Sequence, residues 1–124
     1  MELTKSEHEL MELLWEANKP LSQGEILAAG SRSWKDRSIF VLINGLLEKQ
    51  MIQTVGMVKS GKVYARTFAP TCSREEYYAK ILSAHSPNLP GLVSALLDHT
   101  EVSTDTIHKL EELLKEKKRE MGQR

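Results

Sequence analysis

Apolar residues in the first half of the chain recur at helical spacing in three separate segments. The first segment follows Thr4 and covers residues 5–17, with one apolar side formed by Leu10, Met11, Leu14 and Ala17. The second is short, opening after Ser22 and ending near Gly30. The third has a stripe at positions i, i+3, i+4 and i+7, formed by Ile39, Leu42, Ile43 and Leu46. The pattern predicts three amphipathic helices that share one core.

Capping signals predict where the helices start. Thr4, Ser22 and Ser73 each stand three residues before a glutamate. In such a capping box each side chain satisfies the backbone N–H of the other residue. The third box predicts a further helix after residue 73. Ser33 or Asp36 is expected to cap the helix that carries the third stripe.

The apolar period changes from helical to alternating after residue 51. Residues 52–58 and 63–69 both alternate along the chain, and Ser60-Gly61 between them is a turn dipeptide. Residues 56–62 also match the first seven positions of a phosphate-binding loop, but Val63 stands where Ser or Thr is required. Because strand-like residues flank the match on both sides, the pattern favours a β-hairpin over a nucleotide site.

The last third of the chain predicts two more helices, a short apolar one over residues 92–97 and a longer one capped by Ser103. Residues 1–70 already close a core of their own, so these apolar residues need another surface. A second copy of the same helices would provide it. The predicted organisation is a first domain over residues 1–70 and a helical dimerisation domain over 71–124. The predicted interface residues are Leu92, Val93, Leu96, Ile107, Leu110, Leu113 and Leu114.

Charge is distributed unevenly although the formal net charge is zero. Residues 1–31 carry net −4, residues 32–70 net +5 and residues 71–124 net −1. A basic island between acidic flanks steers a polyanion to one face. No segment reaches the roughly 20 apolar residues of a membrane span, and the first residues do not resemble a signal peptide, so a cytoplasmic protein is expected.

Other chemistry finds little support. Cys72 is the single cysteine and is expected to be inert. His99 and His108 are nine residues apart, which does not place two ligands on one helical face. Asp98, His99 and Ser103 only superficially suggest a triad, because adjacent side chains diverge. No metal, cofactor or enzymatic activity is expected.

Three helices followed by a hairpin with a basic tip form the outline of a winged helix-turn-helix, so residues 1–70 are predicted to be a winged-helix DNA-binding domain. The third helix is expected in the major groove, where Arg37 can pair with guanine, Ser38 and Asn44 can read base edges and Val41 can touch a thymine methyl group. Wing cations are expected on phosphates. The complete predicted DNA-binding set is Lys35, Arg37, Ser38, Val41, Asn44, Lys59, Lys62 and Arg66. Trp34 is expected to pack under the wing, and Trp15 and Met11 in or near the core.

Four segments in order, "ELMELLWE", "SWKDRSIFVLINGLLEKQMI", "KSGKVYARTFAPTCSREEYY" and "VSTDTIHKLEELLKE", resemble the penicillinase and methicillin-resistance repressor family. The resemblance implies a homodimer that binds palindromic operators through winged domains and is held together by C-terminal helices. The family's base-reading residues fall on Arg37, Ser38 and Val41. The chain departs from the family in having Val41 for a hydroxyl residue, Gly45 for a basic one and Phe40 for a polar one.

The resemblance also implies two modes of regulation. The copper-responsive branch has paired cysteines near the C-terminus, and this chain has none there. In the β-lactam branch a membrane sensor leads to cleavage of an Asn-Phe bond, whose position is occupied here by Ala95-Leu96. A regulatory protease or sensor is therefore a candidate partner. The competing hypothesis, motivated by Phe40, Val41 and Gly45, is a protein-interaction adaptor whose winged helix has lost DNA binding.

Overall fold

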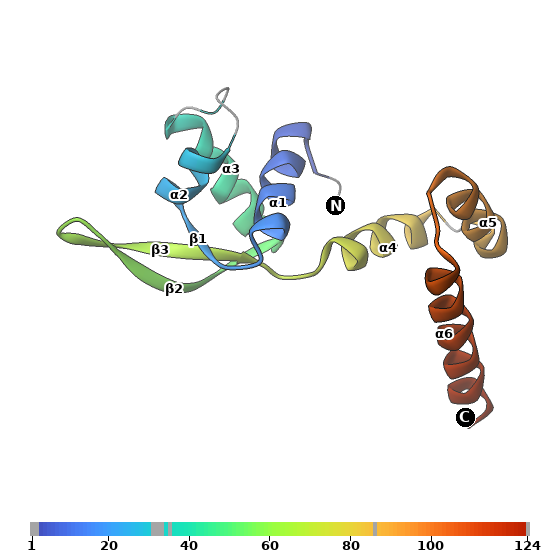
Figure 1. Ribbon diagram of the computed structural model, residues 1–124. Helices are drawn as coiled ribbons and strands as arrows, with labels where there is room; N and C mark the ends of the chain where they lie inside the picture. Colours follow the sequence, from blue (N-terminus) through green and yellow to red (C-terminus); the bar gives the residue numbers. More distant parts are fainter. Residues whose placement is uncertain (1–2, 31–33, 35, 86, 124) are drawn as a thin grey trace. The chain divides into compact units, whose positions relative to one another are not determined.

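The computed structural model describes residues 3–30, 34, 36–85 and 87–123 of the 124-residue chain. These residues form helices and one small sheet (Figure 1). The helices are α1 (Lys5–Ala17), α2 (Gln23–Ala29), α3 (Asp36–Glu48), α4 (Arg74–Ala84), α5 (Leu89–His99) and α6 (Thr104–Gly122). The strands are β1 (Leu21–Ser22), β2 (Ile52–Ser60) and β3 (Val63–Pro70). Two compact units result, residues 1–84 and 85–124.

All three predicted capping boxes are formed. The Thr4 amide donates to Glu7 Oε1 at 2.9 Å, and the Glu7 amide donates to Thr4 Oγ1 at 3.2 Å. The same reciprocal bonds join Ser22 to Glu25 and Ser73 to Glu76. These bonds satisfy N–H groups that have no partner inside the helix, and they fix the starts of α1, α2 and α4 where the sequence predicted them. For α3, Asp36 is the first helical residue, and the alternative cap Ser33 lies outside the described residues.

The three strands are antiparallel in the order β1-β3-β2. The predicted hairpin is confirmed, and its two-residue loop is Gly61-Lys62, one residue later than expected, because Ser60 still pairs with Val63. Gly61 has φ of +65°, a left-handed conformation that glycine adopts without steric cost. The sequence did not predict β1, since a two-residue strand is too short to show a period. Figure 1 shows the hairpin extending past α2 and α3.

The core of the first unit is mostly aliphatic and joins all three helices to the sheet. Its buried members are Leu10, Met11, Leu14, Leu21, Ile26, Trp34, Ile39, Ile43, Leu46, Ile52 and Phe68. The predicted stripe of α3 is therefore confirmed, with Leu42 only partly buried. Trp34 packs against the end of α2, where a Cβ added at Gly30 would lie 2.4 Å from its ring. Three helices followed by a β-hairpin make this unit a winged helix-turn-helix, as predicted.

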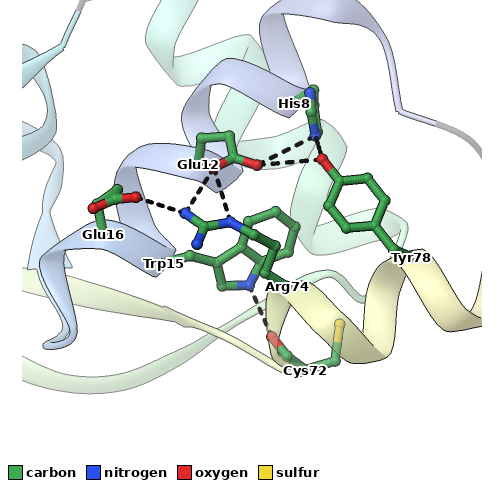
Figure 2. A network of polar contacts seen from close by, with 7 residues as sticks. All are labelled: His8, Glu12, Trp15, Glu16, Cys72, Arg74 and Tyr78. Carbon is green, nitrogen blue, oxygen red and sulfur yellow. Dashed lines mark hydrogen bonds and ion pairs between the residues drawn. The ribbon is translucent and has the colours of Figure 1, made fainter. Parts of the chain in front are cut away.

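The first compact unit ends at Ala84, whereas the predicted domain boundary followed Pro70. The difference arises because α4 packs on α1. Tyr77 is buried between the two helices, and the Trp15 indole N–H donates to the Cys72 carbonyl at 2.9 Å. Figure 2 shows the polar contacts at this junction. The winged unit, residues 3–84, therefore includes α4.

The second unit consists of α5 and α6. Helix α5 is longer than the predicted 92–97, because Asn88 Oδ1 accepts the Gly91 amide at 3.1 Å and caps the helix. Pro90 lies in the first turn, where its missing N–H costs nothing. The two prolines, Pro87 and Pro90, predict a break in the helical pattern, whereas Pro90 belongs to the start of α5. Ser103 caps α6, as predicted.

Candidate nucleic-acid interface

Helix α3 presents a surface that the core does not cover. Ser38 is exposed, Val41 is 67% exposed and Phe40 is 53% exposed, while Asn44 is half-buried. Arg37 belongs to the first turn of α3, and its side chain lies outside the described residues, as does Lys35 altogether. Because Ile39, Ile43 and Leu46 face the core, helical spacing places positions 37, 41 and 44 on the opposite side.

Gly45 occupies the position where the family resemblance suggested a basic residue, and the structure gives a physical reason for its small size. A Cβ at Gly45 would lie 2.9 Å from Glu7 Oε2. The Glu7 carboxylate is buried and accepts hydrogen bonds from the Lys49 ammonium and the Thr4 amide. The absent side chain at residue 45 therefore leaves room for the ion pair between Glu7 on α1 and Lys49, which directly follows α3.

The ionisation of Glu7 follows from the same contacts. Burial raises the pKa of Glu7, but the hydrogen bonds from Lys49 and Thr4 outweigh it, so the pKa lies below its ordinary value of 4.5. Glu7 therefore remains charged at neutral pH. Because the ammonium of Lys49 is bound to Glu7 on α1, this cation differs from those of the wing, which are exposed.

The wing hairpin has two chemically different faces. A bulge at Val55 shifts the register, so that Met57 pairs with Arg66 and Lys59 with Tyr64. These four residues share the face that carries Phe68 nearer the core, and the Arg66 guanidinium lies 5.5 Å from the Phe68 ring centroid. We call Met57, Lys59, Tyr64 and Arg66 the cationic wing face. Beyond the bulge the other face carries small or apolar residues, namely Gly56, Val58, Val63, Ala65 and Thr67.

Strict alternation over residues 52–58 predicts that Val58 shares a face with Ile52 and Thr54, and this grouping is wrong because the bulge reverses the alternation. It also missed Met57 and Tyr64, which are 61% and 65% exposed. Tyr64 could have been found, since period-2 spacing puts it on the face of Arg66. The position of Met57 could not, because a bulge leaves no reliable trace in the alternating pattern.

The charge of the hairpin is of one sign. Lys59, Lys62 and Arg66 are all exposed, and residues 52–70 include no Asp or Glu.

In the second unit, the side chains of the predicted dimer interface are largely uncovered by their own chain. Leu92 and Leu110 are half-buried, and the exposed ones are Val93, Leu96, Ile107, Leu113 and Leu114.

The comparison with protein families identifies the family of this chain. Residues 3–116 match the family model described as penicillinase repressor. The chain belongs to the penicillinase repressor family. The penicillinase repressors are DNA-binding, non-enzymatic transcription regulators, so this member is a winged-helix transcriptional repressor. The family resemblance of the four sequence segments is thereby confirmed.

Other comparisons add less. None of the curated proteins matches this repressor significantly. Among solved structures, the chain is similar to the crystal structure of the adhesin competence repressor from Streptococcus pyogenes, with 15% identity and a TM-score of 0.45. That match covers 97% of this chain and 81% of the other.

Within the described residues, no helix combines the length and apolar character of a membrane span. Nor do those residues gather three or more His, Cys, Asp or Glu side chains into a group able to hold a metal ion.

Proposed function

We propose that this repressor acts as a homodimer that binds an inverted-repeat operator, with α3 in the major groove and the cationic wing face on the backbone. The observation that carries the proposal is the wing, where Lys59, Lys62 and Arg66 are exposed without a single acidic residue in the hairpin. Cations in such an arrangement release counterions from DNA and position the protein without reading sequence. Tyr64 and Met57 lie among these cations and are expected to approach the same strand.

Base reading is assigned to the outer side of α3. Arg37 can donate two hydrogen bonds to guanine, Ser38 and Asn44 can reach base edges, and Val41 fits against a thymine methyl group. Lys35 precedes this helix in the sequence and is expected on phosphate. The exposure of Ser38 and Val41 supports the assignment.

Dimerisation is assigned to α5 and α6. The exposed apolar residues of this unit include Leu96 at 53%, Leu113 at 60% and Leu114 at 69%. Several large apolar side chains left exposed on two helices indicate an interaction surface, and a two-fold dimer buries the same residues on both copies. Two winged units held in a dimer match the symmetry of an inverted repeat. Control by a protease or sensor acting near Ala95-Leu96, which lies within α5, stays a prediction.

Selection of bound sequences from a random duplex pool tests the proposed function. At about 150 mM salt, where non-specific phosphate binding is weak, we expect enrichment of an inverted repeat. Folded protein that enriches no sequence contradicts the proposal. That outcome favours the adaptor hypothesis, which the exposed Phe40 and Val41 on α3 support. An adaptor would bind a protein through these apolar side chains.

The wing makes a separate prediction. Replacing Lys59 and Lys62 by glutamate is expected to lower DNA affinity on all sequences, because phosphate contacts carry no base information. The log–log dependence of affinity on salt should become shallower by about one unit for each phosphate that the variant no longer neutralises. Binding isotherms at several salt concentrations measure both quantities.

The matched control for the wing variant replaces Lys5 and Lys19 by glutamate. Both residues are exposed on the winged unit but lie outside the wing, and the change in net charge is the same. We expect the control to retain most of the salt dependence. Equal reductions in the two variants would show that only the total charge matters, which contradicts a wing interface.

A further inference from the structure

Helix α4 is fastened to α1 by ion pairs. Arg74 Nε donates to Glu12 Oε2 at 3.0 Å, and Arg74 Nη2 donates to Glu16 Oε1 at 2.8 Å. Figure 2 shows this guanidinium between the two carboxylates, with the Tyr78 hydroxyl approaching Glu12 from the other side. That hydroxyl lies 3.4 Å from Glu12 Oε1. One cation of α4 therefore bridges two turns of α1.

Aromatic packing reinforces the ion pairs. Tyr77 is 6% exposed, and its ring centroid lies 5.7 Å from that of Trp15. The Arg74 guanidinium lies over the Trp15 ring at 5.7 Å, and the Tyr78 hydroxyl is 2.9 Å from His8 Nε2. The Arg74 guanidinium therefore has its charge balanced by the carboxylates and its position fixed by the indole ring.

These contacts occupy a face of α1 that borders the core, and Trp15 is the residue that the two share, because it also packs against the core cluster. The core takes Leu10, Met11 and Leu14, whereas α4 binds at positions 8, 12, 15 and 16, which are also helical neighbours. Tyr77 is not a member of the main core cluster. Breaking the attachment of α4 should therefore free this helix without opening the core of the winged unit. We call Glu12, Trp15, Arg74, Tyr77 and Tyr78 the α1–α4 latch.

We propose that the α1–α4 latch makes α4 a rigid extension of the winged unit and thereby sets the spacing between operator half-sites that the dimer accepts. The inference rests on the proposed dimeric operator binding. A tether that joins two DNA-binding units gives a high effective concentration only when its geometry matches the distance between sites. With α4 fixed, the part of the chain left to adjust that distance begins after Ala84, where the compact unit ends.

The individual contacts are modest, because exposed ion pairs each contribute little. The latch acts through their number and through the buried Tyr77. Arg74, Glu12 and Tyr78 are positioning residues in this proposal, and none of them is assigned a contact with DNA. Their removal should change which spacing is bound rather than whether a half-site is bound.

The test uses the full chain with Arg74→Ala and Tyr77→Ala together. Affinity is measured for duplexes that carry two selected half-sites with spacers of different length, and for a duplex with one half-site. The wild-type protein is expected to prefer one spacing sharply. The variant should bind the single half-site with unchanged affinity, bind about tenfold more weakly at the preferred spacing and show a flattened spacer profile.

Lys80→Ala is the matched control, since it removes one exposed cation from the same helix without touching the latch. Amide hydrogen exchange provides a second readout. Exchange should accelerate in α4 of the double variant and stay slow in residues 10–14 of α1, which shows that the core is intact. Sedimentation should show a dimer for the wild-type protein and for the double variant.

Three outcomes would contradict the proposed role of the α1–α4 latch. An unchanged spacer profile in the double variant contradicts it directly. An equal reduction of affinity on every duplex, including the single half-site, shows damage to the winged unit rather than a change of spacing. If the wild-type protein binds half-sites but shows no preference for two of them, dimeric operator binding fails as well. The last result is distinguished from the first two because it appears without any substitution.

Discussion

Replacing Leu113 and Leu114 by aspartate is expected to convert the repressor into a monomer and to lower its operator affinity by about 10²- to 10⁴-fold. Both side chains are mostly exposed on α6, at 60% and 69%. In a dimer they would lie against the partner, where an aspartate would have to give up water without a compensating bond. The monomer would keep its winged unit but bind each half-site independently. Sedimentation and operator titration measure the two effects.

His108→Asp is the control for this prediction. His108 is exposed on the same helix, and helical spacing places it away from the stripe of Ile107, Leu110 and Leu114. We expect this variant to remain dimeric and to bind the operator normally. A leucine variant that stays dimeric would contradict the assignment of the interface to α6, and a monomeric variant with full operator affinity would contradict the role of dimerisation.

The second large effect is expected at Glu7. Replacement by alanine should lower the free energy of unfolding by about 2–4 kcal/mol, because it removes a buried carboxylate that pairs with Lys49 and caps α1 through Thr4. The side chain is only 8% exposed, so solvent screens these contacts little. Urea unfolding at a fixed protein concentration measures the change, since a dimer's stability depends on concentration.

Glu9→Ala removes an equal charge from the exposed side of α1 and is expected to change stability by less than about 0.5 kcal/mol. Similar destabilisation at residues 7 and 9 would show that only helix propensity or net charge is involved.

Replacement of Gly45 provides an independent check of the Glu7 environment. Replacing glycine by alanine inside a helix usually raises the free energy of unfolding by about 1 kcal/mol. Gly45→Ala should raise it by less, because the new Cβ would approach the Glu7 carboxylate.

The same residue predicts how stability depends on pH. The pKa of Glu7 is lowered in the folded protein, so its contribution is complete above the ordinary value of 4.5. The contribution is lost as the pH falls below that value through the lower, folded pKa. The pKa values of Glu25 and Glu76 are lowered too, by hydrogen bonds from Ser22 and Ser73. Glu7→Gln should therefore unfold with a weaker pH dependence in the acid range.

Much of the local structure was predictable because its causes lie within a few residues. The capping boxes at Thr4, Ser22 and Ser73 need only a hydroxyl and a glutamate three positions apart, and all three form. The hairpin followed from alternation and from a glycine at the turn. Helix α5 was predicted too short. Its cap, Asn88, lies between Pro87 and Pro90, and two prolines so close together predict a break rather than a helix start.

Tertiary contacts decided what the sequence could not. The bulge at Val55 is a matter of pairing between strands, and it determined which side chains share a face with Lys59. The role of Gly45 depends on Glu7, which is distant in sequence and meets α3 only in the folded core. The boundary after Ala84 depends on the contacts of Arg74 and Tyr77 with α1.

The sequence by itself determined the order of the helices and of the two hairpin strands, the capped starts of α1, α2, α4 and α6, the core stripe of α3 and the basic character of residues 32–70. These properties depend on periodicity, short-range hydrogen bonds and composition, which can be read along the chain. Only the tertiary structure decided the faces of the wing, the Glu7–Lys49 pair and the attachment of α4 to the winged unit. Each of these joins residues distant in sequence, so no local pattern specifies it.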